Sequence, residues 1–145
     1  MDQIGAGLAG LFENDRPTVV MGTQSRGSLL GVLTARSVGV GLAEVRKDPG
    51  RAADSDAWWE TSTAPDYRDQ HLQLGLRRSL LRSGDSVLFV DDWIATGAQA
   101  EACRALVQMS GAGWIGAAVV VDGLVRSDLR RSLRVRSLLH IRDLA

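Results

Sequence analysis

Two adjacent carboxylates that follow an apolar run are the residues of this sequence best suited to chemistry. The run covers residues 87–90, and Asp91 and Asp92 follow it, before the turn at 95–98. Ligands of open α/β folds lie at the carboxyl ends of strands, and the N–H groups of such a turn, with a helix behind them, bind anions. Carboxylates accept hydrogen bonds from vicinal hydroxyls. The segment therefore predicts a sugar-phosphate site, in preference to a pair of acids that only caps a helix.

Cationic side chains follow two other expected strands. Arg26 stands in the polar turn 22–27, beside Gly27 and the start of a helix, which favours an anion contact over a solvated arginine. Arg46 and Lys47 follow the next strand, and Lys47 is the only lysine among the 17 basic residues. For this pair, a functional role and solvation as loop charges both stay open.

The elements that position these groups alternate between short apolar strands and amphipathic helices, which is typical of a parallel sheet with crossover helices. The patterns predict helices near 4–12, 27–38, 96–109 and 127–132. Strands are expected at 18–21, 40–46, 71–76, 87–90, 114–121 and 135–141. The result is an α/β domain whose sheet has about five strands.

Length and composition limit the class of protein. A chain of 145 residues predicts one domain over residues 1–145. Its 17 basic and 17 acidic residues create no field that would attract nucleic acid or a membrane. A single cysteine, Cys103, permits no internal disulfide and is expected to be buried, which fits a cytoplasmic location. The chain begins without the basic region of a secretory signal.

Residues 47–69 are expected to form a long connection without regular structure, of the kind that closes over a ligand and is mobile without it. Trp58 and Trp59 within it either pack the loop or stack on a flat base. His71 and His140 lack metal-ligand spacing, so a structural role is expected. The arginine-rich stretch 126–142 is expected to be a solvated face rather than a nucleic-acid patch.

Five segments, taken in order, resemble the type I phosphoribosyltransferases, and adenine phosphoribosyltransferases most of all. VLFVDDWIATGAQA resembles the signature that binds phosphoribosyl pyrophosphate (PRPP), and the other four are VVMGTQSRGSLLG, VGVGLAEVRKDPG, PDYRDQHLQLGL and AAVVVDGL. The resemblance implies a type I phosphoribosyltransferase-like (Rossmann-like) core, a parallel sheet flanked by helices. It also implies a reduced hood, because only residues 1–17 precede the first strand, where the family has a longer base-binding region.

The resemblance implies a role for each matched residue. The ribose hydroxyls would be bound by Asp91 and Asp92. The 5′-phosphate would be held by Ala95, Thr96, Gly97, Ala98 and Gln99, and the pyrophosphate by Thr23, Gln24, Ser25, Arg26 and Gly27. Catalytic roles would fall to Arg46, Lys47 and Tyr67, with Asp66 beside Tyr67 on the closing loop. Three positions depart from the family pattern: Trp93 replaces an aliphatic residue, Gln99 a hydroxyl residue and Gln24 an acidic one.

The activity implied by the resemblance is transfer of the 5-phosphoribosyl group from PRPP to a nitrogenous, adenine-like base, with release of pyrophosphate. Mg²⁺ would arrive with PRPP. A homodimer is implied because the Arg-Lys segment of related enzymes lies at a subunit interface. Two alternatives stay open: a non-catalytic regulator of the same fold that binds PRPP or a nucleotide, and a phosphoribosyltransferase of secondary metabolism with a non-purine acceptor.

Overall fold

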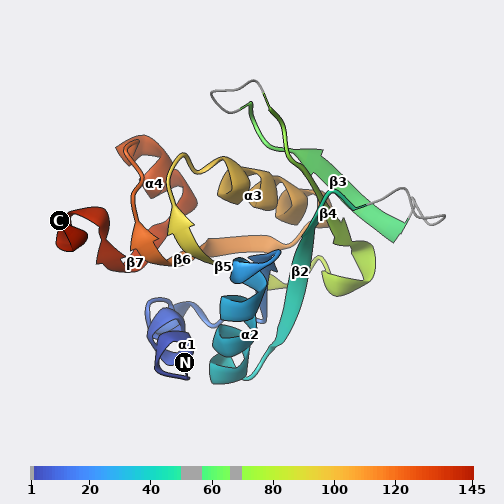
Figure 1. Ribbon diagram of the computed structural model, residues 1–145. Coiled ribbons are helices and arrows are strands. Elements are labelled where there is room, and N and C mark those ends of the chain that lie inside the picture. The colour runs from blue at the N-terminus through green and yellow to red at the C-terminus, as the bar shows by residue number, and fades with distance from the viewer. Residues whose placement is uncertain (1, 50–56, 66–69) are drawn as a thin grey trace.

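A seven-stranded sheet forms the centre of the computed structural model, with helices on both faces (Figure 1). The structure describes residues 2–49, 57–65 and 70–145. The strands are β1 Val19–Thr23, β2 Gly41–Lys47, β3 Trp58–Ser62, β4 Gln73–Arg77, β5 Ser86–Ile94, β6 Gly113–Asp122 and β7 Val135–His140. The helices are α1 Asp2–Gly10, α2 Arg26–Val38, α3 Ala98–Ser110 and α4 Ser127–Leu133, with short 3₁₀ turns at Glu13–Asp15, Arg78–Leu80 and Ile141–Leu144.

Alternate residues of the central strands pack into two separate cores, because successive side chains of a strand point to opposite faces. Met21 and Phe89 belong to the core beneath α3 and α4. Val20 and Leu88 belong to the core beneath α1 and α2. Both faces of these strands are therefore buried, which explains their nearly continuous apolar sequence.

The strand order β3-β4-β2-β1-β5-β6-β7 places β1 between β2 and β5, both parallel to it. The chain leaves β1 through α2 and pairs next on one side, and it later pairs on the other side through β5. The connections that follow β1 and β5 therefore diverge at the carboxyl end of the sheet. Such a switch in direction opens a crevice in which ligands of α/β folds bind.

The sheet differs from the expected one in two places. Residues 58–62, expected to be irregular, form β3, which pairs antiparallel with β4, and β4 pairs antiparallel with β2, so the sheet is mixed. β5 does not stop at Val90, because its pairing with β6 continues through Asp91 to Ile94. The six expected strands and four expected helices are otherwise confirmed within a few residues. No helix in the described part of the chain combines the length and apolar character needed to cross a membrane.

Candidate functional site

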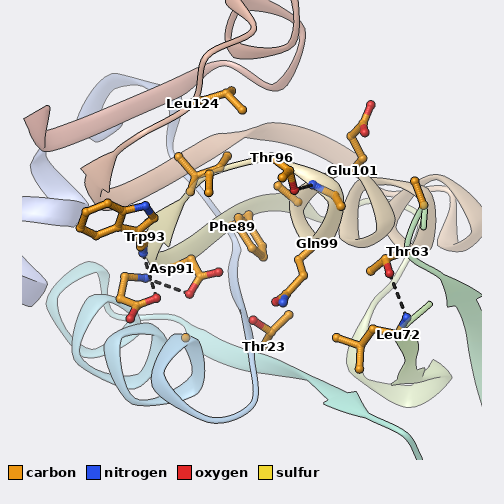
Figure 2. A pocket seen from close by; sticks show the side chains of 18 of the residues that line it. Thr23, Thr63, Leu72, Phe89, Asp91, Trp93, Thr96, Gln99, Glu101 and Leu124 are labelled. Carbon is orange, nitrogen blue, oxygen red and sulfur yellow. Dashed lines mark hydrogen bonds between the residues drawn. The ribbon is translucent and has the colours of Figure 1, made fainter. Parts of the chain in front are cut away.

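A cleft of about 1170 Å³ opens at the carboxyl ends of β1 and β5 (Figure 2). Three regions supply most of its lining: residues 23–27 at the end of β1 and after it, 91–101 from the end of β5 into α3, and 124–126 after β6. Phe89 in β5, Lys47 at the end of β2 and the segments 63–65 and 70–72 complete it. The crevice expected from the topology is therefore a cavity, and both turns that were predicted to bind anions line it.

The turn after β1 is fastened to the neighbouring strand. The backbone N–H of Gln24 donates to the Val45 carbonyl at 3.0 Å, and the Gln24 side-chain oxygen accepts from the N–H of Lys47 at 3.0 Å. The peptide between Gln24 and Ser25 is cis. Gly27 is the second residue of α2, and a Cβ on it would lie 3.2 Å from Asp91 Oδ1, so the absence of a side chain lets the helix start approach the carboxylate.

The two carboxylates lie at the centre of the lining and differ in their partners. Arg26 Nε lies 3.2 Å from Asp92 Oδ2, although the Arg26 side chain is 84% exposed. Asp91 Oδ1 accepts from the N–H of Asp92 at 2.8 Å, and no ion pair among the described residues includes Asp91. Burial raises the pKa of the Asp91 carboxyl to about 7, with the Asp92 charge adding to the rise while its N–H and the charge of Lys47 oppose it.

The turn after β5 presents the N-terminus of α3 to the cleft. Gly97 has a φ of 82°, a conformation that favours glycine, and it directly precedes Ala98, the first residue of the helix. The Ala98 N–H lies 3.3 Å from Thr96 Oγ1. Four N–H groups at the start of a helix lack partners within that helix, and the helix dipole adds positive potential there. The turn is thus suited to a phosphate.

The structure brings most of the predicted site residues together. The whole of 23–27, both carboxylates, the whole of 95–99 and Lys47 line one cleft. Arg46 does not line it; its guanidinium lies 4.0 Å from Glu44, because successive residues of β2 face opposite sides. Tyr67 and Asp66 lie outside the described residues. Figure 2 shows the Gln99 side chain pointing toward Thr23.

Several other sequence interpretations can now be resolved. Trp58 and Trp59 do not line the cleft; they carry the guanidinium groups of Arg77 and Arg78 over their rings at 4.8 and 5.4 Å, which supports packing rather than base stacking. Cys103 is fully buried, and burial raises the pKa of its thiol, so it is an apolar core residue as expected.

The arginines of the 126–142 stretch differ in their exposure. Their ion pairs join Arg126 to Asp128, Arg130 to Asp122, and both Arg134 and Arg136 to Asp15. Arg126, Arg134 and Arg136 are exposed, as expected for a solvated face, whereas that interpretation is wrong for Arg130, whose side chain is only 28% exposed. His140 instead caps the final 3₁₀ turn, where its Nδ1 accepts from the Arg142 N–H.

Sequence reasoning missed part of the lining. His71 lines the cleft, with its Nδ1 3.1 Å from the Thr63 carbonyl oxygen. Trp93 is exposed at the cleft, and the segment 124–126 closes one side. Segment 124–126 could have been found, because it follows the carboxyl end of the strand next to β5. His71 carried no such local signal.

Known proteins resemble this chain in sequence. The family model of the phosphoribosyl transferase domain matches residues 2–142, and the chain therefore belongs to that family. Its relatives include adenine phosphoribosyltransferases. That of Synechococcus sp. (strain JA-3-3Ab) is 38% identical over 122 residues, which cover 84% of this chain and 65% of the relative. That of Methylococcus capsulatus is 35% identical over 131 residues, covering 89% and 74%.

Solved structures agree on the fold. The crystal structure of adenine phosphoribosyltransferase from Thermoanaerobacter pseudethanolicus superimposes with a TM-score of 0.82 at 25% identity, over 96% of this chain and 79% of that one. The enzyme from Rhodothermus marinus gives 0.78 at 27% identity, over 96% and 78%. The fold is thus that of the type I phosphoribosyltransferases. The chain spans about two thirds of the length of the Synechococcus relative.

Proposed function

We propose that this protein transfers the 5-phosphoribosyl group of PRPP to an adenine-like purine base and releases pyrophosphate. The observation that carries the proposal is that one cleft contains two carboxylates together with the turns 23–27 and 95–99, which are suited to binding phosphate groups. PRPP has the matching chemistry, with a monophosphate, vicinal hydroxyls and a diphosphate on one sugar. The adenine phosphoribosyltransferases among the relatives support the choice of an adenine-like acceptor.

Each part of PRPP has a matching set of groups. The N–H groups of 95–99 would bind the 5′-phosphate, and Asp91 and Asp92 would accept hydrogen bonds from the ribose hydroxyls. The turn 23–27, with Arg26, would surround the pyrophosphate, and Lys47 would reach it from β2. Arg26 already neighbours Asp92 at 3.2 Å, so the ribose and pyrophosphate subsites would be continuous.

Magnesium fits this cleft only together with the substrate. No group of three or more His, Cys, Asp or Glu side chains in the described ranges could hold a metal by itself. Mg²⁺ is usually bound by one or two carboxylates together with substrate phosphates, and Asp91 and Asp92 beside a diphosphate would supply such a set. When bound, the ion would neutralise negative charge on the departing pyrophosphate.

The reaction breaks the bond from the anomeric carbon to the pyrophosphate oxygen and forms one to a ring nitrogen of the base, which loses a proton. Positive charge develops on the sugar, and negative charge develops on the leaving group. Fixed cations aimed at the leaving oxygen stabilise that state, and Lys47 and Arg26 are placed to provide them. Holding both reactants in line removes much of the remaining entropic barrier.

A homodimer and a cytoplasmic location belong to the same proposal. Arg46 faces away from its own cleft, which suits a contact with a second subunit and its site. Tyr67 keeps its proposed place on the closing loop. A buried, unpaired cysteine is typical of proteins from a reducing compartment. Light scattering should show a dimer; a monomer at micromolar concentration with full activity would contradict this part.

The decisive experiment measures pyrophosphate release from PRPP and Mg²⁺ with purines, pyrimidines and small aromatic amines as acceptors. Adenine should react fastest, and the nucleotide formed should be AMP. Binding of PRPP without turnover on any acceptor would contradict catalysis and would favour a regulatory protein of the same fold. Turnover on a non-purine alone would keep the transfer but overturn the acceptor.

A further inference from the structure

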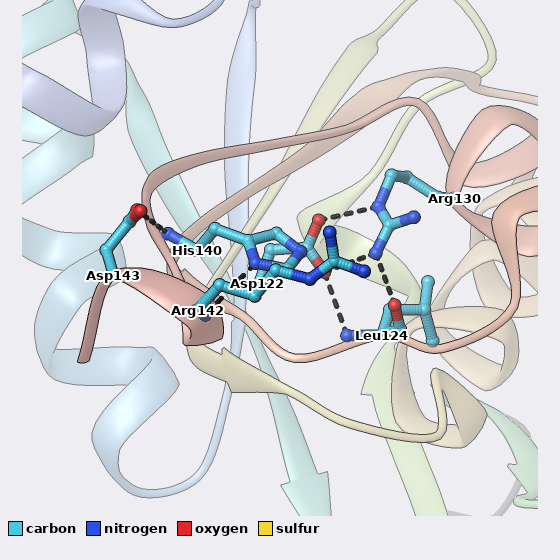
Figure 3. Close-up of polar contacts among 6 residues, drawn as sticks. All are labelled: Asp122, Leu124, Arg130, His140, Arg142 and Asp143. Atoms are coloured by element: carbon cyan, nitrogen blue, oxygen red, sulfur yellow. Dashed lines mark hydrogen bonds and ion pairs between the residues drawn. The ribbon is translucent and has the colours of Figure 1, made fainter. Parts of the chain in front are cut away.

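Asp122 and Arg130 form an ion pair beside the connection that follows β6 and lines one side of the cleft (Figure 3). Arg130 Nε lies 2.6 Å from Asp122 Oδ2, and its Nη2 lies 3.1 Å from Oδ1. Asp122 is 5% exposed as a residue, and the Arg130 side chain is 28% exposed. Neither residue lines the cleft, so the pair does not contact a ligand there.

The pair binds the backbone of one residue, Leu124, through the peptide groups on both of its sides. The Leu124 N–H donates to Asp122 Oδ1 at 2.9 Å, and the Leu124 carbonyl accepts from Arg130 Nη2. The Gly123 N–H donates to the Ile94 carbonyl at 2.9 Å, which joins the same segment to the end of β5. The connection that lines the cleft after β6 is therefore fixed by side chains, with little freedom left to its backbone.

Leu124 and Leu129 connect this fixed segment to the turn 95–99, because both side chains contact Gly97. A Cβ built on Gly97 would lie 2.6 Å from Leu129 Cδ2 and 3.4 Å from Leu124 Cδ1, so both side chains pack directly over this glycine. Leu129 is on α4, the helix that carries Arg130. Leu124 is the residue whose N–H binds Asp122 and whose carbonyl binds Arg130. Gly97 has no side chain of its own to fix its position at the start of α3.

We propose that Asp122 and Arg130 are positioning residues for the phosphate turn 95–99, acting through Leu124 and Leu129 on Gly97. Stability alone explains such a pair poorly, because well-packed apolar residues often stabilise a fold as well or better than a buried ion pair. The carboxylate and the guanidinium both bind the backbone of Leu124, which lines the cleft, and this favours a role in fixing geometry. The identity of the phosphate ligand rests on the proposed function.

The test compares two ligands that occupy opposite ends of the cleft. Isothermal titration calorimetry with ribose 5-phosphate reports on the turn 95–99, and Mg²⁺-pyrophosphate reports on the turn 23–27. Arg130→Met should raise the dissociation constant of ribose 5-phosphate by about tenfold, the size of effect expected when a displaced turn loses one hydrogen bond to the charged phosphate. Pyrophosphate affinity should stay within about twofold of the wild type. Arg130→Lys should be intermediate, since one ammonium cannot fork onto the carboxylate and also reach the Leu124 carbonyl.

Arg134 offers a matched control. It also donates to a backbone carbonyl, that of Ile115 at 2.8 Å, and pairs with an acid, Asp15 at 3.3 Å, but Ile115, unlike Leu124, does not line the cleft. Arg134→Met should lower the free energy of unfolding without changing the dissociation constant of ribose 5-phosphate or of Mg²⁺-pyrophosphate. Equal losses for both ligands in Arg130→Met, or the same pattern in Arg134→Met, would overturn the positioning role.

The remaining outcomes are also decisive. Unchanged ribose 5-phosphate affinity in Arg130→Met overturns the inference, and if that variant does not fold, Arg130→Lys is judged by the same criterion. A wild type that binds pyrophosphate but no ribose 5-phosphate overturns the assignment of 95–99 and the inference with it. A wild type that binds both ligands but transfers nothing overturns only the proposed catalysis.

Discussion

Asp91 and Asp122 are the same kind of residue at the carboxyl-terminal parts of adjacent parallel strands, and their surroundings act on them in opposite directions. Burial raises the pKa of the Asp91 carboxyl to about 7, and no described cation is paired with it. Burial also acts to raise the pKa of Asp122, but the hydrogen bonds from Arg130 and from the Leu124 N–H outweigh it and leave that pKa below its usual value.

The difference distinguishes a carboxylate with a structural role from one that has no cationic partner among the described residues and is suited to binding a ligand. Asp122 has its charge compensated within the chain, so it can fix a connection at the side of the cleft. Asp91 is desolvated, and the Asp92 N–H and the charge of Lys47 compensate for this only in part, an arrangement that costs stability and is common at functional sites. The position next to a strand end does not distinguish the two roles; the presence of Arg130 does.

Removing both central carboxylates should have the largest effect. Asp91→Asn combined with Asp92→Asn should weaken PRPP binding by more than about 100-fold, because each hydrogen bond to a charged group contributes about 1.5–3 kcal/mol. Titration calorimetry with Mg²⁺-PRPP measures this, and circular dichroism checks the fold. Asp2→Asn with Glu13→Gln removes as many charges from exposed positions outside the cleft and should bind normally. Unchanged affinity in the cleft variant would refute the ribose assignment.

The matching substitution of Asp122 should lower the stability of the protein. Asp122→Asn breaks a mostly buried ion pair and should lower the free energy of unfolding by about 2–4 kcal/mol at pH 7, toward the lower end for such pairs because Arg130 is partly exposed. Urea unfolding provides the measurement. Asp15→Asn, which removes the partner of two exposed arginines, should cost less than about 1 kcal/mol. Equal losses in the two variants would remove the distinction drawn for Asp122.

The parts of the site that local sequence encodes could be predicted. An apolar strand, two acids and an Ala-Thr-Gly turn specify Asp91, Asp92 and the turn 95–99 within a dozen residues. Strand β3 could not be predicted in this way, because it lies in a stretch rich in Asp, Ser and Thr that is typical of a loop, and pairing with β4 over Trp58 to Ser62 stabilises it instead. Such cross-strand contacts are not visible in a single segment.

The sequence also could not show which residue of β2 faces the cleft or which residue Arg130 contacts. Alternation along β2 predicts that Arg46 and Lys47 face opposite ways, but only the packed sheet shows that Lys47 faces the cleft. Arg130 stands in an arginine-rich stretch and resembles its neighbours there. Its function depends on the contact with Asp122 from another element, which no helical or strand periodicity indicates.

Lys47 provides the kinetic side of the comparison, since it is a cation that influences Asp91 without pairing to it. Lys47→Ala should lower kcat by about 10- to 100-fold, equivalent to about 1.5–3 kcal/mol for one charge-assisted contact, with a smaller change in KM for PRPP because the contact strengthens in the transition state. Lys47→Arg should recover part of the loss, and Arg36→Ala, an exposed cation outside the cleft lining, should behave as wild type. A fall in PRPP affinity alone would exclude the catalytic role.

The smallest effect is expected from Asp91→Asn alone, and its sign should be opposite to that of Asp122→Asn. The pKa of Asp91 is about 7 in the folded protein and about 3.9 in an unfolded chain. Between these values the native state holds the extra proton, so the free energy of unfolding of the wild type falls as pH rises from about 4 to about 7. Asparagine has no proton to lose there, and its side-chain oxygen still accepts from the Asp92 N–H.

Without ligand, Asp91→Asn should therefore match the wild type near pH 4 and exceed it by about 1–2 kcal/mol at pH 8, since each unit of pKa shift corresponds to about 1.4 kcal/mol and residual hydration reduces the total. Asp122→Asn should show the reverse dependence, because the lowered pKa of Asp122 contributes stability above about pH 4 that disappears in acid. Urea unfolding at pH 4, 6 and 8 tests both. Mg²⁺-PRPP should abolish the advantage of Asp91→Asn at pH 8, since the wild-type carboxylate then gains the partners that the chain does not provide. An Asp91→Asn protein less stable than wild type at pH 8 without ligand would show that the Asp91 carboxylate is already compensated and that the two acids do not differ as argued.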